Sequence, residues 1–475
     1  THTLSFLSLT PKPMTMKRAL PSPSSLLFFF LLITPLFLCQ ENRVSASMPP
    51  SESETLFKIM ESMSSDQQWR QSHPNPCAPG SSWPGIECKT GPDHLSHVSR
   101  LDFGSAPNPS CKSSASFPSS IFTLPFLQSV FFFNCFTHFP TTIMFPIKLI
   151  PNSSLQQLSL RSNPSLSGQI PPRISSLKSL QILTLSQNRL TGDIPPAIFS
   201  LKSLVHLDLS YNKLTGKIPL QLGNLNNLVG LDLSYNSLTG TIPPTISQLG
   251  MLQKLDLSSN SLFGRIPEGV EKLRSLSFMA LSNNKLKGAF PKGISNLQSL
   301  QYFIMDNNPM FVALPVELGF LPKLQELQLE NSGYSGVIPE SYTKLTNLSS
   351  LSLANNRLTG EIPSGFESLP HVFHLNLSRN LLIGVVPFDS SFLRRLGKNL
   401  DLSGNRGLCL NPEDEFSVVK TGVDVCGKNV SSGGGLSVHS SKKKSQASRY
   451  YRSCFFANAL FPFALFLGLH QRWVL

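Results

Sequence analysis

The residues that could do chemistry in this 475-residue sequence do not form the arrangements that enzymes use. The sequence holds no G-x-S-x-G nucleophile motif, no H-E-x-x-H metal motif, no glycine-rich phosphate loop and no kinase signature set. Gly433–Gly435 open no helix and are typical of a linker. We therefore expect a binding protein rather than an enzyme, with no cofactor and no bound metal.

Cysteines and asparagines are the residues that most clearly indicate chemistry. Two of the eight cysteines, Cys39 and Cys454, lie in strongly apolar segments, which leaves six elsewhere. A zinc site is disfavoured because no C-x2-C pairs or histidine clusters accompany these six, so we expect disulfides. Four sequons predict N-glycosylation and, with the disulfides, a secretory route. The four asparagines are Asn152, Asn347, Asn376 and Asn429.

The first residues are typical of a secretory signal peptide, which we place at residues 14–46. Lys17 and Arg18 precede the 14-residue apolar run Leu26–Cys39, and Val44-Ser45-Ala46 supplies small residues for cleavage. A membrane-spanning helix is the alternative, but 14 residues extend only about 21 Å against about 30 Å of hydrocarbon.

A second apolar run, Cys454–Leu469, lies in a hydrophobic tail at residues 454–475, after a polar linker at 431–453. Small residues, a polar spacer and an apolar tail form the pattern for a glycosylphosphatidylinositol anchor, with Ser440 or Ser441 as attachment site. A single transmembrane helix is the alternative, although it would be short and interrupted by Pro462. Both interpretations predict the outer face of the plasma membrane.

Charge does not indicate a nucleic-acid partner. The net charge of +13 includes +3 from residues 1–46 and +6 from residues 431–475, which leaves +4 for the whole region between. A region so close to neutral lacks the basic surface that nucleic-acid binding requires.

The middle of the chain is periodic with the unit L-x-x-L-x-L-x-x-N-x-L-x-G-x-I-P. A period of 24–25 residues with this leucine spacing predicts a leucine-rich repeat solenoid, an α/β superhelix with a parallel β-sheet along its concave face. We expect about twelve repeats and a capping strand near Val98–Phe103 within residues 98–405, between caps at 47–97 and 406–430. The asparagine position should form a hydrogen-bonded ladder, which Cys135 and Ser332 should interrupt. This position is occupied by Asn163, Asn188, Asn212, Asn236, Asn260, Asn284, Asn308, Ser332, Asn356, Asn380 and Asn405.

The L-x-G-x-I-P extension resembles that of the plant extracellular leucine-rich repeat proteins. Members of that family begin with a paired-cysteine cap containing a Trp-x-Gly-φ-x-Cys element, which here is Trp83–Cys88. Before it, Ser51–Arg70 indicates a capping helix, with Ser51 and Glu54 as a capping box. The resemblance implies a disulfide between Cys77 and Cys88. Cys111 with Cys135, and Cys409 with Cys426, are the other neighbouring pairs, and each pair would staple an end of the solenoid.

The solvent-facing positions of the sheet are where a partner could bind. Between the buried leucines, apolar and acidic residues gather in one stretch, which favours an interface. Asp208, Asp232 and Asp256 recur at one strand position and are better explained as repeat filler. The predicted partner-binding residues are Phe278, Ala280, Tyr302, Ile304, Asp306, Glu326 and Glu330, with Tyr211 and Tyr235 as further candidates.

The resemblance implies a kinase-less receptor-like protein or co-receptor that binds a secreted peptide, a receptor kinase ectodomain, or both. The alternative is an inhibitor similar to the polygalacturonase-inhibiting proteins of the plant cell wall. Those proteins share the scaffold but are shorter and soluble.

Overall fold

A computed structural model describes residues 47–78, 83–147, 153–412 and 421–427. The predicted signal peptide and tail, Asn152, Asn429, Ser440 and Ser441 lie outside these residues. Among the helices of the described ranges, none is long and apolar enough to cross a membrane.

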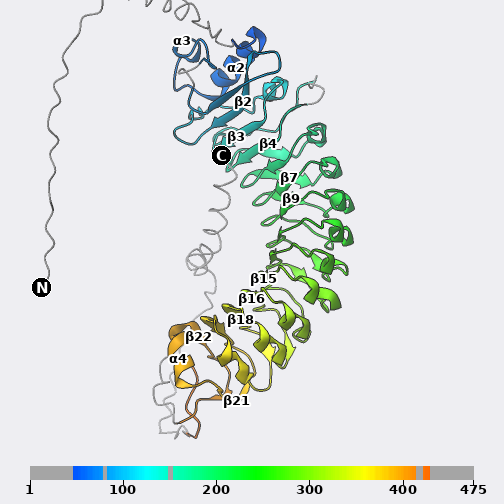
Figure 1. Cartoon of the computed structure of the whole chain (residues 1–475), viewed down its shortest axis with the longest axis vertical. Helices are drawn as coiled ribbons and strands as arrows, with labels where there is room; N and C mark the ends of the chain where they lie inside the picture. Colours follow the sequence, from blue (N-terminus) through cyan, green and yellow to red (C-terminus); the bar gives the residue numbers. More distant parts are fainter. Residues whose placement is uncertain (1–46, 79–82, 148–152, 413–420, 428–475) are drawn as a thin grey trace, which may run out of the picture. The chain divides into compact units, whose positions relative to one another are not determined.

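Fourteen strands form one sheet, and its order follows the sequence (Figure 1). All neighbours are parallel except β1 and β2, which pair antiparallel. After the capping strand β2, twelve strands from β3 to β22 each begin one coil. The strands are β1 (Ile86–Thr90), β2 (Ser96–Phe103), β3 (Ser129–Phe133), β4 (Gln157–Arg161), β6 (Ile182–Thr184), β8 (His206–Asp208), β10 (Gly230–Asp232), β11 (Lys254–Asp256), β13 (Phe278–Ala280), β15 (Tyr302–Ile304), β16 (Glu326–Gln328), β18 (Ser350–Ser352), β20 (His374–Asn376) and β22 (Leu400–Asp401).

The coils that begin with β4 to β18 each return through a 3-10 helix on the side opposite the sheet (Figure 1). The Ile-Pro end of the repeat places proline at the N-cap, where its fixed φ suits the start of the helix, as at Pro195 with φ −66°. The helices are η1 (Ser119–Thr123), η2 (Pro172–Ser176), η3 (Pro196–Ser200), η4 (Leu220–Asn224), η5 (Pro244–Gln248), η6 (Val270–Lys272), η7 (Lys292–Asn296), η8 (Val316–Phe320), η9 (Glu340–Lys344), η10 (Ser364–Ser368) and η11 (Gly397–Asn399).

Short strands on the flank between the sheet and these helices join neighbouring coils a second time. Gly216 shows why the repeat has glycine there: its φ is +73°, and a Cβ would lie 2.4 Å from Oδ1 of Asp193 in the preceding coil. The flank strands are β5 (Ser167–Gln169), β7 (Arg189–Asp193), β9 (Lys213–Thr215), β12 (Phe263–Gly264), β14 (Lys285–Leu286), β17 (Ser335–Gly336), β19 (Arg357–Leu358), β21 (Ile383–Val385) and β23 (Gly407–Cys409).

The asparagine ladder is present as predicted, and Asn284 illustrates it. Its Oδ1 accepts from the Leu262 N–H of the preceding coil at 3.0 Å, and its Nδ2 donates to the carbonyl of Leu257 in that coil at 2.9 Å. Nδ2 also donates to Leu281 and Ser282 of its own coil. The ladder therefore satisfies buried backbone groups that the strands leave unpaired.

The two expected interruptions of the ladder have different outcomes. Cys135 supplies no carboxamide, because its Sγ is joined to Cys111, and its own N–H donates to Oδ1 of Asn163 in the next coil at 2.7 Å. The hydroxyl of Ser332 accepts from the Asn308 N–H at 3.2 Å and donates to the Glu330 carbonyl at 2.8 Å. The Ser332 hydroxyl thus replaces the asparagine carboxamide in the ladder, although it makes fewer hydrogen bonds.

The N-terminal cap corrects the predicted helix at 51–70. Helix α2 spans Pro50–Met63 and a separate short helix, α3, spans Trp69–Ser72. No side chain caps α2, because its N-cap residue is Pro49, which has no polar side chain; Pro50 follows at the first helical position, which suits proline. Glu54 therefore makes no capping box with Ser51; it forms an ion pair with Arg70 at 2.6 Å.

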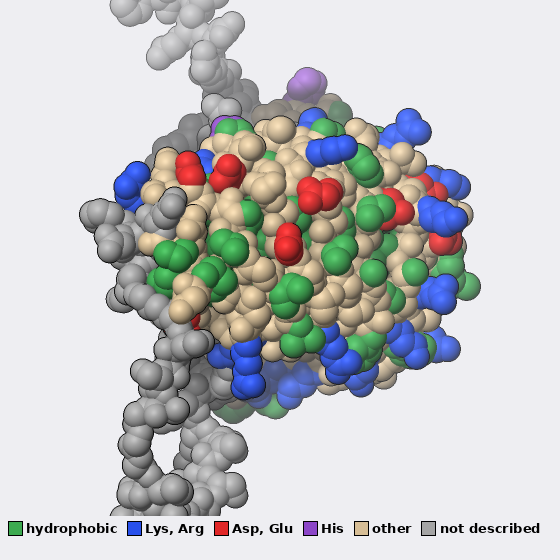
Figure 2. Space-filling model, turned by 90° about the horizontal axis from the view of Figure 1, so that it is seen from below, with side chains coloured by type: hydrophobic (Ala, Val, Ile, Leu, Met, Phe, Trp, Pro, Cys, Tyr) green, Lys and Arg blue, Asp and Glu red, His purple; other side chains and the backbone are tan. Residues whose placement is uncertain are grey.

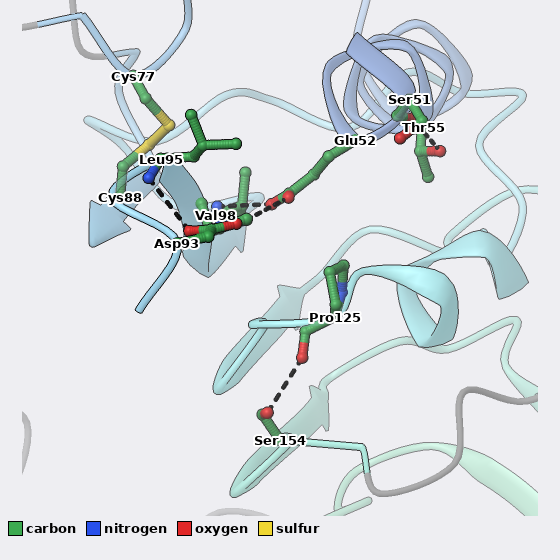
Figure 3. A network of polar contacts seen from close by, with 11 residues as sticks. Ser51, Glu52, Thr55, Cys77, Cys88, Asp93, Leu95, Val98, Pro125 and Ser154 are labelled. Carbon is green, nitrogen blue, oxygen red and sulfur yellow. Dashed lines mark hydrogen bonds and ion pairs between the residues drawn. A yellow bond between two sulfur atoms is a disulfide. The ribbon is translucent and has the colours of Figure 1, made fainter. Parts of the chain in front are cut away.

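A buried polar network fixes this cap to the sheet (Figure 3). Glu52 of α2 and His97 of β2 are 4% and 2% exposed, and Glu52 Oε2 lies 2.6 Å from His97 Nδ1. The other imidazole nitrogen lies 3.0 Å from Asp93, and the Val98 N–H donates to Glu52 Oε1 at 2.9 Å. Burial lowers the pKa of His97, but the hydrogen bonds to Glu52 and Asp93 outweigh burial and raise it overall.

Three disulfides hold the two ends of the solenoid. The structure joins Cys77 to Cys88, Cys111 to Cys135, and Cys409 to Cys426, which are the predicted pairs. At the C-terminal end, helix α4 (Ser390–Leu396) is capped by Asp389, which accepts from the Phe392 N–H at 2.7 Å.

Candidate ligand-binding face

The outward-facing positions of the parallel strands form the candidate site, which we call the sheet face. Strands β8 to β16 pair in register, so equivalent residues of successive coils lie side by side. Neighbouring strands are about 4.8 Å apart, so side chains at one position make a continuous row. The sheet therefore determines which of the predicted residues meet.

Phe278, Tyr302 and Ile304 form an apolar cluster on β13 and β15. The rings of Phe278 and Tyr302 are 6.1 Å apart between centroids, and all three side chains are half-buried. The Tyr302 hydroxyl lies 3.1 Å from Oε1 of Gln325. These three predicted residues lie together and remain accessible.

Ala280 does not belong to the accessible surface, contrary to our expectation. Only 5% of it is exposed, because its short side chain lies between Asp256 and Ile304 on the two neighbouring strands. Because its side chain is short, Ala280 leaves a shallow depression in the sheet face beside the apolar cluster.

Acidic residues border the apolar cluster on its C-terminal side. Burial raises the pKa of both Asp306 and Glu326, against hydrogen bonds that lower it. Asp306 accepts from the Ser282 hydroxyl, and Gln328 donates to Glu326. Glu330 is half-buried in the same coil as Glu326. The predicted rim of charge is thus present.

The acidic row of Asp208, Asp232 and Asp256 borders the cluster on its N-terminal side. Burial, followed by repulsion from Asp232, raises the pKa of Asp208 and raises that of Asp256 to about 6. Lys254 Nζ lies 2.8 Å from Asp232 Oδ2 and 5.9 Å from the Phe278 ring centroid. Lys254, which the sequence did not single out, therefore connects the acidic row to the apolar cluster.

A third row follows the edge of the sheet, at the residue just before the asparagine ladder. These residues have a left-handed backbone, and we call them the edge row. Tyr211 and Tyr235 belong to it; each is 47% exposed, and their rings stack 4.1 Å apart and nearly parallel. Its residues from β6 to β20 are Gln187, Tyr211, Tyr235, Ser259, Asn283, Asn307, Asn331, Asn355 and Arg379.

Farther along the sheet, β20 holds the predicted glycosylation residue Asn376. It is half-buried on the sheet face, and its Oδ1 accepts from the N–H and hydroxyl of Ser378 at 3.1 and 2.7 Å. Asn347 is exposed ahead of β18, and its Nδ2 donates to the Pro322 carbonyl at 2.6 Å. Glycans at both positions stay predictions.

Seen from the end of the molecule in Figure 2, acidic side chains lie among neutral and hydrophobic ones, while Lys and Arg gather along the lower and right edges. In the described ranges, His, Cys, Asp and Glu form no group that could hold a metal ion. The residues described above give the sheet face itself apolar surface, hydrogen-bonding groups and negative charge.

Comparison with known proteins identifies the repeat. Family profiles described as leucine-rich repeat match residues 153–214, 178–238, 251–273 and 322–382. The fold is a leucine-rich repeat solenoid. It resembles the plant receptor-like proteins: it is 38% identical to the protein Too Many Mouths of Arabidopsis thaliana over 142 residues, 29% of this chain and 27% of that protein. The chain thus matches about a quarter of the length of this relative.

Solved structures share the fold over a larger part of the chain. The ectodomain of the Arabidopsis thaliana receptor kinase GASSHO1/SCHENGEN3, solved with CASPARIAN STRIP INTEGRITY FACTOR 2, superposes with a TM-score of 0.60 at 28% identity, covering 77% of this chain and 43% of that one. The ectodomain of the Arabidopsis receptor kinase HAESA, solved with an extended IDA peptide hormone, gives 0.53 at 28% identity, covering 66% and 62%.

Proposed function

We propose that this protein is a kinase-less receptor-like protein or co-receptor that binds a secreted peptide, a receptor kinase ectodomain, or both. The observation that carries the proposal is the accessible apolar cluster between two groups of acids on in-register strands. Aromatic residues surrounded by polar ones are the usual anchors of protein interfaces. The similarity to ectodomains solved with a peptide hormone supports a peptide as partner.

The charge of the face limits the chemistry of the partner. The acids on the sheet face from β8 to β16 include Asp208, Asp232, Asp256, Asp306, Glu326 and Glu330. Among these described residues, only Asp232 forms an ion pair, with Lys254. A partner with apolar side chains for the cluster and cationic side chains beside them would complement it. The acids would mainly set the rate of association and its dependence on salt.

We also propose that the protein is held at the outer face of the plasma membrane by a glycosylphosphatidylinositol anchor. Three disulfides support an oxidising compartment. Phosphatidylinositol-specific phospholipase C should release the full chain from plant membranes. Retention in the membrane after complete digestion would favour the transmembrane alternative.

Affinity purification of the tagged full-length protein, followed by mass spectrometry, tests the function. We expect a receptor kinase or a secreted peptide among the bound proteins. Recovery of a polygalacturonase or another cell-wall hydrolase instead would favour the inhibitor alternative. The partner identified in this way then serves for binding measurements.

The double variant Phe278→Ala/Tyr302→Ala tests the site itself. Loss of a buried aromatic anchor typically costs about 2 kcal/mol or more, so affinity should fall at least about thirtyfold. The matched control is Phe263→Ala/Phe320→Ala, which removes two exposed rings away from the sheet face and should leave affinity unchanged. Wild-type affinity in the first variant would reject the apolar cluster as the site.

A further inference from the structure

A hollow on the flank beside the sheet face has features that the scaffold does not require. It has a volume of about 430 Å³ and is lined by residues of three successive coils. Phe311 is 62% exposed, and its ring lies where a Cβ on Gly333 would come within 2.5 Å. The Arg357 guanidinium lies 5.6 Å from the centroid of the same ring. The lining is Asn307, Asn308, Pro309, Phe311, Asn331, Ser332, Gly333, Asn355, Asn356 and Arg357.

The repeat departs from its own consensus at this hollow. Where the other coils from β4 to β20 have glycine in the L-x-G turn, this coil has Val312, and Phe311 adopts the left-handed backbone instead, with φ of 48°. A left-handed conformation costs a bulky L-residue about 1–2 kcal/mol. Such a cost is typical of functional positions, because a repeat chosen for stability alone would keep glycine.

One wall of the hollow is a ladder of carboxamides from the edge row. Asn331 Nδ2 donates to Asn307 Oδ1 at 2.7 Å, and Asn355 Nδ2 donates to Asn331 Oδ1 at 2.7 Å. Each amide nitrogen has two N–H groups, so one on each remains for a ligand. The ladder fixes the orientation of these groups before any ligand arrives.

Arg357 is the only charged residue of the lining. Among the residues that the structure describes, it has no acidic side chain within ion-pair distance. Its planar guanidinium beside the Phe311 ring presents paired donors that match a carboxylate. The hollow thus combines one cation, amide donors and an aromatic surface.

We propose that this hollow binds an acidic side chain, Asp or Glu, of a peptide partner. The carboxylate would accept from Arg357, the amide donors of Asn331 and Asn355 would bind neighbouring carbonyls, and Phe311 would cover the aliphatic part. The inference rests on the proposed function, since it assumes a peptide partner. It adds that the partner has acidic residues for the flank as well as cationic residues for the sheet face.

An array of octapeptides provides the probe. Peptides with Asp or Glu at the centre are compared with the same peptides carrying Asn or Gln, and binding of the full-length protein is measured. Wild type should bind the acidic members about tenfold or more tightly, because a hydrogen bond to a charged group typically accounts for that factor. Arg357→Gln should abolish the preference. Phe311→Asn, which keeps a residue that tolerates the left-handed backbone, should weaken binding of the acidic and the amide peptides alike.

Matched controls exist in other coils. Arg189 occupies the repeat position of Arg357, and Phe263 that of Phe311. Arg189→Gln and Phe263→Asn should keep the preference. The proposal is overturned if wild type does not discriminate, if Arg357→Gln still discriminates, or if Arg189→Gln loses as much. Retention of oligogalacturonate in place of acidic peptides would also overturn it.

The outcome for the hollow is separable from that for the proposed function. The Phe278→Ala/Tyr302→Ala variant should keep the preference for acidic peptides, since those rings lie outside the hollow. Failure of the array with continued loss of partner binding in the double variant would reject only the hollow.

Discussion

The coils that begin with β8, β10 and β11 form a first stretch, and those that begin with β13, β15 and β16 form a second. The two stretches have the same backbone conformation, but their exposed side chains differ. The first stretch repeats aspartate on the strand and stacks two tyrosines on the edge. The second places aromatic and aliphatic groups on the strands and asparagines on the edge. Buried positions are nearly the same in both. Stability and recognition are therefore assigned to different positions of one repeat, so they can be tested separately.

The largest loss of stability should come from variants of the asparagine ladder. In the second stretch, one position of this ladder is occupied by Ser332 instead of asparagine. Asn284→Ala leaves the Leu262 N–H without its partner and removes one of the two side-chain hydrogen bonds to the Leu257 carbonyl, and should lower the free energy of unfolding by about 3 kcal/mol. Ser332→Ala removes one hydroxyl and should cost about 1 kcal/mol. Urea denaturation of the two variants measures the difference, and equal losses would show that a hydroxyl supports the ladder as well as a carboxamide.

The N-terminal cap lies outside both stretches, and its contribution to the stability of the protein should depend on pH. His97→Gln should destabilise the protein by about 2 kcal/mol at low pH, because charged hydrogen bonds to Glu52 and Asp93 are lost. The folded pKa of His97 is above its ordinary value of 6.5. The contribution is therefore complete below about pH 6.5 and is lost as pH rises through the folded pKa.

Thermal unfolding of wild type and His97→Gln at about pH 5 and about pH 9 checks this dependence. His374→Gln is the control with the opposite sign, because burial lowers the pKa of His374 and penalises wild type at low pH. A constant difference between wild type and His97→Gln at both pH values would show that charge does not matter in the cap.

A smaller effect, and a stabilising one, is expected on the face of the first stretch. The pKa of Asp256 is raised from 3.8 to about 6, so wild type loses stability as pH rises from about 4 to about 6. Asp256→Asn removes that loss and should be more stable above pH 6, by about 1 kcal/mol after allowance for solvent screening. Asn376 shows that asparagine at this repeat position keeps both bonds to the following serine.

Melting temperatures of wild type and Asp256→Asn at about pH 4 and about pH 7 decide the matter. The variant should gain only at the higher pH. A lower melting temperature at neutral pH would mean that Asp256 is needed for stability as a charge, in which case the acidic row is more than repeat filler.

The smallest effect concerns the edge of the first stretch. Tyr211→Ser introduces serine, which already occupies the same edge-row position at Ser259. The change removes the stacking of Tyr211 on Tyr235, which should contribute about 0.5–1 kcal/mol to the free energy of unfolding. A double-mutant cycle with Tyr235→Ser measures this coupling. A coupling near zero would leave the two exposed rings without a structural role and would favour them as partner contacts.

The features that follow from the repeat period could be predicted from the sequence. The contacts that depend on packing between distant segments could not. Leucine and asparagine spacing predicted about twelve coils and most of the inward and outward positions, because each coil meets only its neighbours. The contact of Glu52 with His97 joins residues 45 positions apart and follows from how α2 packs, which no repeat encodes. Strand β1 was missed for the same reason.

In the candidate site, the accessible cluster of Phe278, Tyr302 and Ile304 could be predicted from strand alternation. The burial of Ala280 could not, because it depends on the size of the side chains on both neighbouring strands. The flank hollow could have been suspected from the missing glycine at Val312, since that departure from the consensus is visible in the sequence.

The asparagine ladder has a direction. Asn212 reaches back to Leu185 and Leu190, and Asn284 reaches back to Leu257 and Leu262, so each coil completes the hydrogen bonds of the coil made before it. A chain that emerges from the ribosome amino end first would leave only its newest coil incomplete at any moment. The last coil is completed by the cap, where the Leu402 N–H donates to Thr421. Assembly of this protein could therefore proceed in step with its synthesis, with closure of the Cys409–Cys426 bond as its final event.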